Sequence, residues 1–159
     1  SQMGGLIHLL RGMYILVPRN MTKAAGFYNT LLTTDEPALV IECLNGYRLK
    51  EPLPTNLGAF KTPIGVVETL KEGTDITLVS YASTLRIVEE AAKELQQVGI
   101  DAEVIDVQSL LPLDLNHDMV KSVQKTNRLL VIDEDVPGGA SAYILQHIVD
   151  VQNGYQYLD

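Results

Sequence analysis

Short apolar runs alternate with stretches of helical periodicity along most of this 159-residue chain. Residues 75–81 (DITLVSY) are typical of a buried strand, and the apolar residues that follow recur at helical spacing until Gly99 ends the helix. Residues 102–107 (AEVIDV) and 128–132 (RLLVI) provide two further strands, with a short helical pattern between them. Alternating strands and helices predict an α/β fold, an open, mostly parallel sheet with helices on both faces.

The first part of the chain predicts a smaller unit of the same kind. Residues 13–17 (MYILV) and 38–41 (ALVI) flank a helix expected over about residues 21–32, which Asn20 or Thr22 can cap. A strand, a helix and a strand in this order imply a parallel pair. Two strands and one helix leave a parallel sheet poorly covered, so we expect this unit to be the tail of a larger domain or to lean on another chain.

Glycine, proline and asparagine crowd the stretch from Leu44 to Pro63, which lacks any sustained periodicity. We therefore predict a linker at 46–70, between a domain remnant at 1–45 and a C-terminal domain at 71–159. Within that domain, residues 110–115 (LLPLDL) are expected to turn the chain before a helix capped by Asp114 or Asn116.

Composition and charge restrict the function classes. A net charge of −8 without a Lys/Arg cluster argues against nucleic-acid binding. No apolar run approaches a membrane span, and no secretory signal is visible. The single cysteine, Cys43, fits a reducing compartment, so we expect a cytoplasmic protein. The chain starts at Ser1 without a methionine, and we expect it to be a piece of a longer protein.

Three consecutive carboxylates, Asp133, Glu134 and Asp135, end the last strand and precede a Pro-Gly-Gly turn. They have three interpretations: an acid/base pair, a metal site, or a solvated or interface-facing strand end. The last is favoured, because no partner set accompanies them. The glycines match neither phosphate-binding motif, G-x-G-x-x-G or G-x-x-x-x-G-K-[ST], so they are expected to serve a tight turn.

Other reactive side chains form no recognisable set. The histidines His8, His117 and His147 lack metal-ligand spacing, and Cys43 has no histidine nearby in the sequence. No serine stands in a G-x-S-x-G context. The residues alone therefore predict a fold, with no catalytic, cofactor-binding or metal residue.

Three segments resemble a known family: residues 73–84 (GTDITLVSYAST), 90–114 (EAAKELQQVGIDAEVIDVQSLLPLD) and 121–139 (KSVQKTNRLLVIDEDVPGG). Their order and spacing are similar to the C-terminal domain of the β subunit of thiamine-diphosphate-dependent 2-oxoacid dehydrogenases. Residues 10–42 resemble the end of the pyrimidine-binding domain of that subunit. Transketolases and deoxyxylulose-phosphate synthases share this architecture more distantly.

The resemblance implies a part of the decarboxylating component of a 2-oxoacid dehydrogenase complex. Such a component oxidatively decarboxylates a branched-chain 2-oxoacid or pyruvate and transfers the acyl group to a lipoyl group; overall similarity favours the branched-chain substrate. In that family the α portion holds the diphosphate and magnesium, and the first half of the β portion holds the aminopyrimidine. Both lie outside this chain, so the resemblance implies a fragment that is inactive alone and binds no thiamine diphosphate.

The partners implied by the resemblance are an α subunit or fused α portion, a second β copy, and the lipoyl acyltransferase core. The core's basic subunit-binding domain would dock near an acidic surface that includes Asp150 and the Asp133–Asp135 cluster. The related enzymes also hold a potassium ion at a D-x-N-P turn. Thr34 and Glu36 stand at the matching positions here and depart from that turn, so the resemblance assigns no potassium ion to this chain, although backbone carbonyls could bind one.

The resemblance assigns no catalytic residue to this chain. Ser1-Gln2 is either the stub of the family's H-S-Q-type motif or a cloning remnant, and His8 does not match the histidine of that motif. Three alternatives stay open. The first is a non-catalytic interaction module, and the second is a transketolase-like or deoxyxylulose-phosphate-synthase-like C-terminal domain. The third is a free-standing, flavodoxin-like binder of FMN or a dinucleotide.

Overall fold

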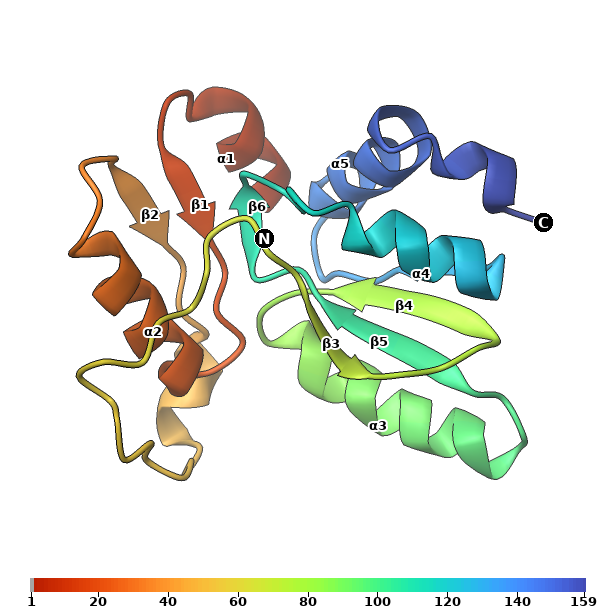
Figure 1. The fold of residues 1–159 in the computed structure, drawn as a ribbon, viewed down its shortest axis with the longest axis horizontal. Helices are drawn as coiled ribbons and strands as arrows, with labels where there is room; N and C mark the ends of the chain where they lie inside the picture. The colour runs from red at the N-terminus through yellow and green to blue at the C-terminus, as the bar shows by residue number, and fades with distance from the viewer. Residues whose placement is uncertain (1) are drawn as a thin grey trace.

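The computed structural model describes residues 2–159 as two sheets side by side, with helices around them (Figure 1). Five α-helices form: α1 (Met3–Leu9), α2 (Met21–Leu31), α3 (Thr84–Gln97), α4 (Asp118–Thr126) and α5 (Ala140–Gln146). The strands are β1 (Tyr14–Leu16), β2 (Ala38–Val40), β3 (Glu68–Lys71), β4 (Ile76–Ser80), β5 (Ala102–Asp106), β6 (Ser109–Leu111) and β7 (Leu129–Val131). Three shorter helical segments are the 3-10 turns η1 (Leu44–Arg48) and η3 (Gly154–Tyr157) and the π-helical η2 (His147–Val151).

The larger sheet has the order β3-β5-β4-β7 and confirms the predicted fold class. Strand β4 lies parallel to both β5 and β7, and only the edge strand β3 is antiparallel. On one face, Leu78 and Val104 pack against the apolar side of α3. On the other face, Val79 and Ile105 belong to the cluster that α4 and α5 cover, so helices cover both faces (Figure 1).

The smaller sheet has the order β2-β1-β6. Strands β1 and β2 are parallel and α2 connects them, as the βαβ prediction requires. The Asn20 side chain caps α2 by accepting a hydrogen bond from the Lys23 N–H at 2.9 Å, so the first of the two predicted caps is the one used.

The prediction of a turn over residues 110–115 is partly wrong. Ser109–Leu111 form β6, which pairs antiparallel with β1. Gln108 has a φ of 59°, and this left-handed residue redirects the chain from β5 in the larger sheet to β6 in the smaller one. The turn follows only at Pro112, and the predicted cap Asp114 accepts hydrogen bonds from the Asp118 and Met119 N–H groups at 2.9 and 2.8 Å.

Two elements overlap the ends of the stretch predicted as a linker at 46–70. Its last residues begin β3, because Glu68–Lys71 pair with β5 along the edge of the larger sheet, and η1 occupies its beginning. Residues 49–67 contain no helix or strand. This stretch crosses α2, where the Asn29 side-chain amide donates to the carbonyls of Leu57 and Phe60 at 2.7 and 2.8 Å.

One hydrophobic core joins the segments on either side of the linker. Met3, Ile7 and Ile15 share a cluster with residues of β4, β5 and α5. This cluster and the pairing of β1 with β6 attach the smaller sheet to the rest of the chain. The division into a remnant, a linker and a C-terminal domain stays a prediction about the parent protein.

Candidate functional site

Two of the three carboxylates after β7, Asp133 and Asp135, accept hydrogen bonds from backbone N–H groups. Asp133 accepts from the Ser141 N–H at 2.7 Å, in the first turn of α5. Asp135 accepts from Val136 and Gly4, both at 2.9 Å, and from Ala140 at 3.4 Å. These two side chains satisfy N–H groups that a helix start leaves unpaired, and Asp135 also connects α1 to α5.

The turn glycines have a matching structural role. A Cβ on Gly4 would lie 2.7 Å from the Gly139 Cα, and one on Gly139 would lie 2.4 Å from an oxygen of Asp135. The two backbones therefore approach each other too closely for side chains, and the expected tight turn is present at Gly138 with φ of 84°. The Asp135 hydrogen bonds and the glycine contact together hold α1 against α5.

A second charged cluster connects the two sheets. The Arg19 guanidinium, just after β1, lies 2.7 Å from Asp106 at the end of β5 and 2.5 Å from Glu68 on β3. Lys23 on α2 also contacts Glu68, at 2.8 Å. The Asp106 side chain is fully buried, whereas that of Arg19 is 20% exposed. Burial raises the pKa of Asp106 to about 6, although the hydrogen bond from Arg19 opposes this change.

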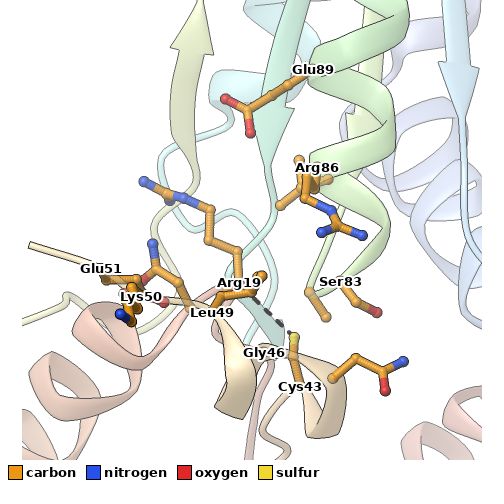
Figure 2. Close-up of a pocket in the computed structure, with 13 residues that line it drawn as sticks. Arg19, Cys43, Gly46, Leu49, Lys50, Glu51, Ser83, Arg86 and Glu89 are labelled. Carbon is orange, nitrogen blue, oxygen red and sulfur yellow. Dashed lines mark hydrogen bonds between the residues drawn. The ribbon is translucent and has the colours of Figure 1, made fainter.

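A cavity of about 340 Å³ opens next to this cluster (Figure 2). Its wall combines Arg19 and Cys43, which follow β1 and β2, with Ala82 and Ser83, which follow β4. The remaining lining residues come from η1 and the three residues after it, from the first turns of α3, and from Asn20, which caps α2. The cavity therefore lies where the carboxyl ends of strands from both sheets meet.

The cavity contains no recognisable catalytic set. The Cys43 thiol is buried and donates to the Pro18 carbonyl at 3.4 Å. Burial, with the nearby carboxylates of Glu134 and Asp106, raises its pKa, so the thiol stays protonated and is a poor nucleophile. No histidine lines this cavity next to Ser83 or Cys43. The arrangement is suited to binding and supplies no nucleophile–base pair.

The other residues singled out in the sequence do not line this cavity, although Glu134 lines an adjoining pocket together with Cys43 and Ser83. Glu134 and Asp150 are exposed, on the loop after β7 and on η2. Thr34 donates its hydroxyl to the Leu31 carbonyl at 3.2 Å, and Glu36 is exposed. The potassium turn and the acidic interface of Asp133, Glu134, Asp135 and Asp150 therefore stay predictions. Ser1 lies outside the described residues.

Within residues 2–159, no group of three or more His, Cys, Asp or Glu side chains could hold a metal ion. Over the same residues, no helix has the length and apolar character that crossing a bilayer requires.

Sequence reasoning missed Arg19 and Asp106. Asp106 interrupts an apolar run in a predicted strand. Because a buried carboxylate needs a cationic partner, this interruption was a sequence signal for an ion pair. Arg19 stands in the Pro18-Arg19-Asn20 break, where nothing in the sequence distinguishes it from a solvated loop residue.

Comparison with known proteins extends these observations. Residues 65–159 match the family model described as "Transketolase, C-terminal domain". The chain belongs to this family. The match begins just before β3 and covers the whole larger sheet, with β6 and the helices that follow it.

The sequence similarity to relatives extends over both sheets. The chain is 32% identical over 155 residues to "Acetoin:2,6-dichlorophenolindophenol oxidoreductase subunit beta" of Bacillus subtilis (strain 168), which covers 98% of this chain and 44% of that protein. It is 32% identical to "Pyruvate dehydrogenase E1 component subunit beta" of Chlorokybus atmophyticus over 93% of this chain and 43% of that protein. The chain thus spans less than half the length of these two relatives.

A solved structure shows the same fold. The chain named "Split gene transketolase, inactive beta4 tetramer" superposes with a TM-score of 0.74 at 22% identity, over 94% of this chain and 48% of that chain. The transketolase C-terminal family and this neighbour agree with the fold that the strand and helix pattern predicted.

Proposed function

We propose that this chain is the C-terminal part of the β subunit, or β portion, of a thiamine-diphosphate-dependent 2-oxoacid dehydrogenase in the cytoplasm. One observation carries the proposal: the identity of 32% to a named β subunit runs through 98% of the chain, across both sheets. The parent protein would oxidatively decarboxylate a 2-oxoacid, pyruvate or a branched-chain one, and pass the acyl group to a lipoyl carrier.

The residues of this chain do not fit the cofactor. Within residues 2–159 there is no cluster of three metal-ligating side chains, and the turn before α5 is occupied by carboxylates that repel a diphosphate. In the parent enzyme, thiamine diphosphate with magnesium would supply the electron sink for decarboxylation. No step of that chemistry is assigned to these residues, and their proposed role is assembly.

The assembly role rests on the surfaces of the chain. We propose three partners: an α subunit or fused α portion, a second β copy, and the lipoyl acyltransferase core. The net charge of −8 and the exposed carboxylates Glu134 and Asp150 support docking of a basic domain of that core. The solved neighbour is itself named as a β4 tetramer, which supports contacts between β copies.

A transketolase-like parent is the second candidate, because the solved neighbour is a transketolase with the same fold. Its identity of 22% supports the fold and not the reaction, whereas both curated relatives named above are dehydrogenase or oxidoreductase β subunits.

The two candidates can be separated by assaying the parent protein with its α partner. We expect reduction of 2,6-dichlorophenolindophenol that requires a 2-oxoacid, thiamine diphosphate and Mg²⁺. Pyruvate and branched-chain 2-oxoacids, tested side by side, identify the substrate. Transfer of a ketol unit between sugar phosphates, without reduction of the dye, would instead support the transketolase. A parent protein inactive in both assays would support a non-catalytic interaction module.

A further inference from the structure

The cavity at the junction of the two sheets has the location of a ligand site. In open α/β sheets, ligands bind outside the carboxyl ends of the strands. Here the residues after β1, β2 and β4 contribute Arg19, Cys43 and Ala82 to one cavity. Its volume of about 340 Å³ falls within the range of small-molecule pockets.

The cavity has cationic groups that the protein does not neutralise. Lys50 and Arg86 both line it and are exposed, and neither has an ion-pair partner within residues 2–159. Arg19 differs, because Asp106 and Glu68 already hold its guanidinium. Figure 2 shows Ser83 and Arg86 along α3 on one side of the cavity and Lys50 on the other.

Two carboxylates, Glu51 and Glu89, also line the cavity, and Glu134 lines an adjoining pocket with Ser83. Glu51 accepts hydrogen bonds from the Met21 and Thr22 N–H groups at 3.2 and 3.3 Å, so the start of α2 compensates its charge. Glu89 lies one turn further along α3 than Arg86, away from the start of that helix (Figure 2). Lys50 and Arg86 are therefore cationic groups of this wall that form no ion pair within residues 2–159.

The rest of the wall adds polar donors and apolar surface. Ser83 precedes the 14-residue helix α3, and its side chain makes no capping hydrogen bond. The Leu85 N–H donates to the Ala82 carbonyl at 3.4 Å, and the other N–H groups at this helix start can meet an acceptor. Leu49 and Leu85 form apolar parts of the same wall. Such a wall favours a ligand with an apolar body and a negatively charged group.

We propose that this cavity binds a small organic oxyanion, with the anionic group between Arg86, Lys50 and the start of α3 and the apolar body against Leu49 and Leu85. The proposal does not depend on the thiamine diphosphate chemistry proposed for the parent protein. Because its wall comes from both sheets, an occupant would contact both of them.

Amide NMR spectra of the 159-residue chain test the proposal, with benzoate and phenyl phosphate as probes and benzyl alcohol as the neutral analogue. We expect saturable shifts of the amides of Ser83, Thr84 and Arg86 with at least one anion, and much smaller shifts with the alcohol. Comparing benzoate with phenyl phosphate shows whether a carboxylate or a phosphate is preferred. Arg86→Gln and Lys50→Gln should each weaken binding about tenfold, the loss expected for one charge-assisted contact.

Lys121→Gln is the matched control, because it removes the same charge from an exposed lysine on α4 outside this cavity. It should leave binding unchanged. The proposal is overturned if benzyl alcohol shifts the same amides as strongly as the anions. Wild-type affinity in both the Arg86 and the Lys50 variant would overturn it as well, as would anion-dependent shifts confined to other parts of the chain.

Discussion

At the scale of single residues, the position of Asp135 was predictable and its role was not. Its place at the end of a strand follows from the sequence, but its contact with Gly4 depends on how α1 returns to α5. Partial burial raises the pKa of Asp135. The hydrogen bonds from the N–H groups of Gly4, Val136 and Ala140 lower it by more, so its pKa lies below the ordinary value. An ionised side chain at this position therefore stabilises the fold.

Asp135→Ala should lower the free energy of unfolding by about 1 kcal/mol at pH 7, the usual cost of losing a helix cap. A carboxyl group whose pKa is lowered by folding stabilises above its unfolded pKa of about 3.9 and loses that contribution as the pH falls. The difference between the two proteins should therefore shrink below about pH 4. Urea unfolding from pH 3 to pH 7 measures it.

Asp150→Ala removes the same charge from an exposed position and serves as the control. A loss of stability in the Asp150 variant equal to that in the Asp135 variant would mean that net charge, and not the three hydrogen bonds, accounts for the effect.

At the scale of elements, the sequence predicted those whose signals are local. The βαβ unit, α3 with its Gly99 end and the strands β4, β5 and β7 all follow from apolar runs and helical periodicity. Strands β3 and β6 were missed for different reasons. Glu68–Lys71 contains no apolar run, and Ser109–Leu111 becomes a strand only because β1 lies beside it. Pairing partners that are distant in sequence leave no local signal.

The contact between α1 and α5 gives a prediction with a control in the same helix. Gly4→Ala places a Cβ 2.7 Å from the Gly139 Cα, so the helices must separate, and we expect a loss of about 1–3 kcal/mol. Gly5→Ala meets nothing within 4 Å, and alanine favours a helix, so a gain of about 0.5–1 kcal/mol is expected. Thermal unfolding of both variants measures the difference. Equal effects of the two substitutions would contradict the close packing of α1 on α5.

At the scale of the whole molecule, the Arg19–Asp106 pair joins the smaller sheet to the larger one. Arg19→Met leaves the fully buried Asp106 carboxylate without its cation, and we expect a loss of about 3 kcal/mol at pH 8. Folding raises the pKa of Asp106 to about 6. The buried carboxyl group is neutral below that pH, and its charged form destabilises the folded protein as the pH rises through about 6. The cost of Arg19→Met should therefore be smaller at pH 5, where Asp106 takes up a proton.

Adding Asp106→Asn to the Arg19 variant removes the stranded charge and should restore part of the stability at pH 8. Lys71→Met is the control, because its partner Asp101 has a side chain that is 46% exposed, so a lone Asp101 stays solvated and the loss should be less than about 1 kcal/mol. A cost that is the same at pH 5 and pH 8 would show that packing of the Arg19 side chain, and not its charge, joins the sheets.

The central proposal also concerns the whole molecule: this chain serves subunit assembly, and the cofactor binds elsewhere in the parent protein. Titration calorimetry of thiamine diphosphate with Mg²⁺ into the folded 159-residue chain tests it most directly. We expect no saturable heat for the chain, whereas the parent protein with its α partner should bind the cofactor. Saturable binding to the isolated chain at micromolar concentration would contradict it.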